Sequence, residues 1–199
     1  MDNSGELVKK MHGSAIKATE CLSLLQTAFT RNSSEPLSDC RDNLIFIRKT
    51  EAESTLKIAE LLRKNHSLKP YLPIPQDLLR IADHIEKLIE TIHKKIKEDV
   101  LFSDRAISEI TLLLQKLAEI LKTTADLLII NNPVLIRFVE ESEAEVSNKT
   151  LEYATLHEER LIEGLCHPIA SPLFLAMLNS IHAIAWDAKE IASKFAQQD

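Results

Sequence analysis

The chain has 199 residues, of which 45% are hydrophobic, 27% are charged and only 5% are aromatic, with three glycines and seven prolines. This length gives one large domain or two small ones, and the apolar fraction excludes intrinsic disorder. A β-sandwich or barrel needs many tight turns with positive φ, which three glycines cannot supply, so the composition predicts an all-α protein. The net charge is −6 and the basic residues are spread along the chain, which excludes the usual nucleic-acid-binding class.

Prolines divide the sequence into six segments in which apolar residues recur every three or four positions, the pattern of amphipathic helices. Two proline-bearing segments, residues 66–75 and 166–172, are predicted to lie outside regular structure. Ser103 is the predicted N-cap of the fourth helix. In chain order, the predicted helices cover residues 6–30, 36–65, 76–97, 103–132, 133–164 and a last segment that follows residue 172.

The order of helix, long helix, proline segment and helix occurs twice, which predicts an internal repeat. Residues 1–99 and residues 100–199 would each form a three-helix bundle, giving two tandem, pseudo-symmetric bundles in one all-α protein. The two long helices also share residues at equal spacing: Glu51-Ala52-Glu53, Lys57 and Glu60 in the first, and Glu143-Ala144-Glu145, Lys149 and Glu152 in the second.

A glutamate interrupts the apolar stripe of each long helix. Glu51 follows Ile47 on the inward face of the first, and Glu143 follows Val139 on that of the second. A carboxylate there raises the free energy of the folded state unless a cation, a metal ion or hydrogen bonds compensate it. Three interpretations remain open: an ion pair with a lysine or arginine of a neighbouring helix, a rotation of the helix that exposes the glutamate to water, or metal ligation.

Other ligand-type residues lie on the third and last helices. Asp83, Glu86 and Glu90 share one stripe of the third helix, and His182 lies on the corresponding stripe of the last. Carboxylates and imidazole suit iron, manganese or zinc, and the metal sites of helical bundles are built from facing helices. A lone histidine on a helix flank is also typical of a hydrogen-bonded structural residue.

No catalytic motif accompanies these residues in the sequence. A ferritin-like di-iron site needs Glu-x-x-His on two helices, and the sequence has one such element, from Glu90 to His93. The sequence also lacks a phosphate-binding glycine loop, H-E-x-x-H and G-x-S-x-G. We therefore expect a protein that is not an enzyme, and a metal-dependent enzyme remains a third hypothesis.

The sequence also indicates a cellular compartment. Residues 1–20 lack the pattern of a signal peptide, and the longest apolar runs, residues 127–130 and 173–178, are much shorter than the roughly 20 residues of a membrane span. The three cysteines have no C-x-x-C spacing, which is typical of a reducing compartment. We expect a cytoplasmic protein with no direct membrane span.

Residues 77–84, Asp-Leu-Leu-Arg-Ile-Ala-Asp-His, resemble the D-L-E-R-I-G-D-H signature of PhoU-like phosphate regulators and depart from it at Leu79 and Ala82. The two Glu-Ala-Glu tripeptides resemble the E-A-D element of the short branch of that superfamily. The resemblance implies a PhoU-like fold of two three-helix bundles. It also implies a regulatory or adaptor protein that modulates phosphate transport by contacting a phosphate transporter or a membrane sensor kinase.

The resemblance further implies metal binding by an acidic cluster on each repeat, with Fe, Zn, Mn or Mg as the ion. The residues concerned, with their neighbours on the same stripes, are Glu51, Glu53, Asp83 and Glu86 in the first repeat and Glu143, Glu145 and His182 in the second. Leu79 replaces a glutamate of the first cluster, and Asn179 and Trp186 stand where acids are expected in the second. We therefore hypothesise a partial or lost metal site that is more complete in the first repeat. The alternative function is a helical protein-interaction module of the same fold without a metal or phosphate role, and both functions are compatible with a homo-oligomer.

Overall fold

The computed structural model describes residues 3–63 and 66–196, and within these ranges it contains six long α-helices and two short 3₁₀ helices. The predicted all-α class and the six helices are confirmed. In chain order the elements are α1 (Asn3–Arg31), α2 (Pro36–Leu62), η1 (His66–Tyr71), α3 (Ile74–Lys97), α4 (Asp104–Ile129), α5 (Pro133–Ile162), η2 (Pro168–Ala170) and α6 (Ser171–Ala196).

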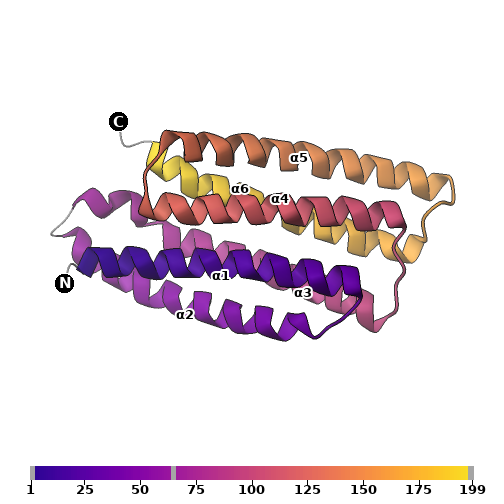
Figure 1. The fold of residues 1–199 in the computed structure, drawn as a ribbon, viewed down its shortest axis with the longest axis horizontal. Helices are drawn as coiled ribbons and strands as arrows, with labels where there is room; N and C mark the ends of the chain where they lie inside the picture. Colours follow the sequence, from indigo (N-terminus) through magenta and orange to yellow (C-terminus); the bar gives the residue numbers. More distant parts are fainter. Residues whose placement is uncertain (1–2, 64–65, 197–199) are drawn as a thin grey trace.

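The six helices run along one long axis (Figure 1). Helices α1, α2 and α3 contact one another, as do α4, α5 and α6, while α1 packs against α4 and α3 packs against α6. Helices α2 and α5 therefore lie on the outside of the two halves, at opposite edges of the view in Figure 1. The predicted division between residues 99 and 100 lies in the connection from α3 to α4.

A single apolar core includes residues from all six helices and joins the two halves. Its aromatic members show this most directly. Phe102, in the connection between α3 and α4, makes edge-to-face contacts with Phe29 of α1 at 5.6 Å and with Phe174 of α6 at 6.2 Å between ring centroids. Such contacts add to the stabilisation from burial of the rings, so the halves fold against each other through a shared interior.

The proline segments are more regular than predicted. Residues 66–71 form the 3₁₀ helix η1 with Pro70 inside it, and α3 begins at Ile74, before Pro75. The last helix likewise begins at Ser171, before Pro172. The prediction failed because the first turn of a helix needs no intrahelical N–H donor, so proline is accommodated there. Helix α2 ends at Leu62, earlier than predicted, and residues 64 and 65 lie outside the described residues.

Three helices end in a residue with left-handed backbone: Asn32 after α1 (φ 52°), Asp99 after α3 (φ 50°) and Gly164 after α5 (φ 73°). In each case the next backbone N–H donates to a carbonyl five residues earlier, the Schellman pattern that ends a helix. Asparagine and aspartate tolerate this conformation better than other non-glycine residues. The chain therefore ends its helices sharply with very few glycines.

Helix α6 has the most apolar sequence. Together with η2 it is the one segment among the described residues that is long and apolar enough to cross a membrane. It contacts α3, α4 and α5, and its buried residues line the shared core on several sides. The apolar window of this segment is half buried inside the fold, so α6 is a core helix with one exposed face.

Candidate functional site

The two interrupting glutamates have the same local environment in α2 and α5. The Thr55 hydroxyl donates to Glu51 Oε1 at 3.0 Å, and the Ser147 hydroxyl donates to Glu143 Oε1 at 2.6 Å, in each case from one helical turn later. The ion pairs that follow also recur: Lys57–Glu60 at 2.9 Å and Lys149–Glu152 at 2.8 Å. The repeat seen in the sequence therefore extends to side-chain hydrogen bonding.

The two glutamates differ in burial and in charge compensation. Glu143 is only 3% exposed, and Lys189 of α6 donates to its Oε2 at 2.7 Å. Burial raises the pKa of Glu143, but the hydrogen bonds from Lys189 and Ser147 outweigh that effect and hold it below its usual value. Glu51 is only half-buried and has no ion pair in the described part of the chain. Of the three interpretations left open, the ion pair with a neighbouring helix describes Glu143, and the partial exposure to water describes Glu51.

Arg48 of α2 holds two of the predicted acids of α3 together. Its guanidinium lies 3.2 Å from Asp83 Oδ1 and 3.5 Å from Glu86 Oε2, and Arg41 approaches Glu86 at 3.7 Å. These groups are largely exposed at the seam between the two helices. Asp83 and Glu86 therefore share cations that α2 itself provides.

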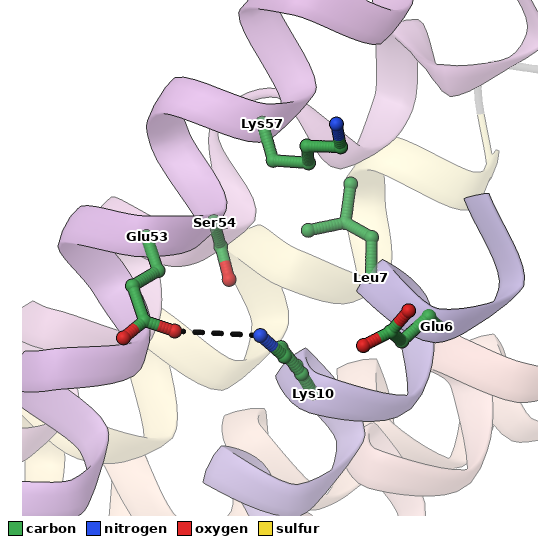
Figure 2. A pocket seen from close by; sticks show the side chains of 6 residues that line it. All are labelled: Glu6, Leu7, Lys10, Glu53, Ser54 and Lys57. Atoms are coloured by element: carbon green, nitrogen blue, oxygen red, sulfur yellow. Dashed lines mark hydrogen bonds and ion pairs between the residues drawn. The ribbon is translucent and has the colours of Figure 1, made fainter. Parts of the chain in front are cut away.

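Glu53 points away from these acids, toward α1. It pairs with Lys10 at 3.4 Å across a small pocket of about 160 Å³ between α1 and α2 (Figure 2). Figure 2 shows Glu6 and Lys57 at the same pocket, with the Ser54 side chain directed into it. The Ser54 hydroxyl is buried and has no hydrogen-bond partner among the described residues. The pocket has equal numbers of acidic and basic groups on its walls.

The remaining predicted ligands lie on the second repeat. Glu145 is exposed and pairs with Lys116 of α4 at 2.7 Å. His182 is exposed on α6, close enough to Glu143 to contribute to the lowering of its pKa. The structure thus brings Asp83 to Glu86 and His182 toward Glu143.

The seven predicted ligands do not fit a metal site as they are arranged. No three histidine, cysteine, aspartate or glutamate side chains converge on one point in the described ranges. Every predicted carboxylate except Glu51 is engaged by a lysine or arginine: Glu53, Asp83, Glu86, Glu143 and Glu145. A metal ion would have to displace these cations, so the prediction of metal binding stays a prediction.

A polar network that was not predicted from the sequence joins the two halves. Arg80 of α3 donates to Asp187 of α6 at 2.8 Å and also lies 2.8 Å from Asp77, one turn away on its own helix. His84 Nε2 approaches the other oxygen of Asp187 at 3.7 Å. Burial raises the pKa of Asp77 against the opposing effect of Arg80. At the boundary between the halves, Arg80 contacts both Asp187 and Asp77, and His84 approaches Asp187. All three residues, Asp77, Arg80 and His84, belong to the 77–84 element.

A second buried ion pair lies inside the second repeat. Arg160 of α5 contacts both carboxylate oxygens of Glu109 of α4, at 2.8 and 2.9 Å. The neighbouring His157 is buried, its ring lies 4.6 Å from that of Phe174, and neither ring nitrogen has a hydrogen-bond partner among the described residues. Burial lowers the pKa of His157. Glu109 could have been noticed as another charge on an inward stripe, but its partner is 51 residues away.

Comparison with solved structures shows which fold this arrangement represents. The chain superposes on PhoU from Pseudomonas aeruginosa with a TM-score of 0.83 at 15% sequence identity, over 97% of this chain and 95% of that one. The chain has the PhoU fold. A PhoU-like protein from Shewanella oneidensis MR-1, named as phosphate regulatory, matches with a TM-score of 0.59, also at 15% identity, over 94% of this chain and 93% of that one. No protein-family model and no curated protein sequence matches the chain. The PhoU-like fold that the 77–84 element implied is therefore confirmed by shape, while sequence identity is low.

Proposed function

We propose that this protein is a non-catalytic regulatory adaptor that modulates phosphate transport from the cytoplasm. The observation that carries the proposal is the likeness to PhoU along nearly the whole of both chains. A match of this extent includes both three-helix halves and their mutual packing. The polar residues of the 77–84 element support the proposal, because they contribute to the contact between the halves.

The charge distribution supports a partner with a basic surface. Residues 1–99 contain 16 lysines and arginines and 15 acids, whereas residues 100–199 contain 8 and 15. Much of this acidic excess is exposed along the outer helix α5: Glu140, Glu141, Glu145, Glu152, Glu158 and Glu159. Cytoplasmic loops of membrane proteins are enriched in lysine and arginine. A phosphate transporter or a membrane sensor kinase therefore offers a complementary surface to α5.

Phosphate uptake in cells provides the test. Deleting the gene is expected to change the rate of labelled-phosphate uptake, and the wild-type gene should restore it. Glu140→Lys with Glu141→Lys should fail to restore it, because the reversed charges repel a basic partner. Asp39→Lys with Asp42→Lys on α2 is the matched control with the same change of net charge. Unchanged uptake after the deletion would contradict the proposed function.

One observation favours the alternative of an interaction module without a metal or phosphate role. Five of the seven predicted metal ligands are engaged by lysines or arginines, so the surface of the bundle is suited to protein contacts without an ion. Normal uptake in the deletion strain, together with capture of a partner that depends on Glu140 and Glu141, would support this alternative.

A further inference from the structure

Both oxygens of the buried Glu143 carboxylate accept hydrogen bonds from side chains of the same chain. One oxygen accepts from Lys189 at 2.7 Å and the other from Ser147 at 2.6 Å. The Lys189 ammonium also lies 4.9 Å from the centre of the Trp186 ring, a favourable cation–π distance. Lys189 is thus fixed from two sides, by an anion and by an aromatic face.

We propose that Lys189 takes the place of a metal ion in the second repeat and excludes one from Glu143. A metal ion on Glu143 would lie about 2.0–2.2 Å from a carboxylate oxygen, close beside an ammonium that already contacts that carboxylate. Repulsion between the two cations, and loss of the Lys189 hydrogen bond, oppose binding. In the first repeat, Arg48 likewise forms ion pairs with Asp83 and Glu86. Asp83, Glu86 and Glu143 are therefore compensated by side chains of the chain itself.

If Lys189 excludes a metal ion, replacing it by a glutamate should create a metal site. Lys189→Glu places a second carboxylate beside Glu143, and paired carboxylates suit manganese. The matched control is Lys116→Glu, which removes an ion pair of the same 2.7 Å length from Glu145, a glutamate whose side chain is 48% exposed. Trp186, the single tryptophan of the chain, reports on the site by its fluorescence.

The experiment is a titration with Mn²⁺, followed by Trp186 fluorescence and by thermal unfolding, with circular dichroism to verify folding. The wild type and Lys116→Glu should show no stoichiometric binding, whereas Lys189→Glu should bind one Mn²⁺ per chain with quenched fluorescence and a raised Tm. If Lys189→Glu does not fold, Lys189→Gln replaces it, and Mn²⁺ should raise the Tm of that variant alone. Stoichiometric binding of Mn²⁺ to the wild type that Glu143→Gln abolishes would overturn the inference. So would a folded Lys189 variant whose fluorescence and Tm do not change with Mn²⁺.

Discussion

Replacing Arg80 by methionine tests whether the inter-repeat network stabilises the fold. The substitution keeps an apolar stem of similar length but leaves Asp77 and Asp187, whose side chains are each only 5% exposed, without their shared cation. Removing one partner of a buried ion pair costs about 3–5 kcal/mol. Because the Arg80 side chain is itself 41% exposed, water screens part of the effect, and we expect a loss of about 2–3 kcal/mol.

Arg48→Met is a closely matched control. Arg48 is also 41% exposed and also contacts two acids, but Asp83 and Glu86 are 55% and 26% exposed. Ion pairs of that kind contribute about 0–1 kcal/mol. The two arginine variants therefore differ mainly in the burial of the carboxylates that they leave behind.

Urea unfolding followed by circular dichroism measures both variants against the wild type. In thermal unfolding, for a chain of this size, a loss of about 2–3 kcal/mol lowers the Tm by about 4–12 °C. Equal losses for Arg80→Met and Arg48→Met, or a loss below about 0.5 kcal/mol for Arg80→Met, would refute the reasoning, because burial of the carboxylates would then not decide the cost.

The pH dependence gives a second readout of the same variant. Burial raises the pKa of Asp77, and Arg80 opposes that effect, so Arg80→Met should raise it further. A carboxyl group with a higher pKa in the folded state stabilises that state at acidic pH, and the contribution is lost as the pH rises through the folded pKa. The deficit of Arg80→Met should therefore grow as the pH rises from the folded pKa of Asp77 in the wild type to its higher folded pKa in the variant.

Two further predictions concern the second repeat. Arg160→Met should cost about 2–4 kcal/mol in urea unfolding, because it leaves the buried Glu109 with only the largely exposed Arg105, 3.3 Å away, as a cation. Glu109→Leu with Arg160→Met should come within about 1 kcal/mol of the wild type, and a double variant as unstable as the single one would contradict this. His157→Leu should stabilise the protein most at acidic pH. Because the folded pKa of His157 lies below the ordinary histidine pKa of 6.5, the wild type loses stability as the pH falls from 6.5 toward the folded pKa. Leucine does not titrate, so the variant does not have this loss. Parallel curves of Tm against pH for the wild type and His157→Leu would argue against it.

The positions of the helices are predictable from this sequence because two independent signals coincide. Apolar residues recur with helical period, and prolines mark the boundaries, so the predicted and observed ends of most helices differ by only a few residues. At Pro75 and Pro172 the helices α3 and α6 begin earlier than predicted, because proline is accommodated in the first turn of a helix. Proline locates a boundary well but does not say on which side of it the helix begins.

The partners of charged residues are much less predictable. The contact of Arg80 with Asp77 follows from a spacing of three on one helix, whereas Asp187 lies 107 residues away. Which side chains meet across helices depends on the axial register between them, and a period of 3.6 residues does not determine that register. For the same reason the sequence identified Glu143 as an inward charge but left open whether a lysine or arginine, water or a metal ion compensates it.

The two equivalent glutamates show that the degree of burial decides whether a carboxylate needs a counter-charge or is solvated by water. Glu51 and Glu143 occupy matching positions, and each accepts a hydroxyl from one turn later. Only Glu143 is nearly inaccessible to water, and only Glu143 has a lysine against it in the described part of the chain. A buried carboxylate without a counter-charge is strongly disfavoured, whereas a half-exposed one is solvated, so deeper burial in the second repeat requires a cation that the first does not. The requirement can be met by a metal ion or by a side chain, and in this chain Lys189 of α6 meets it.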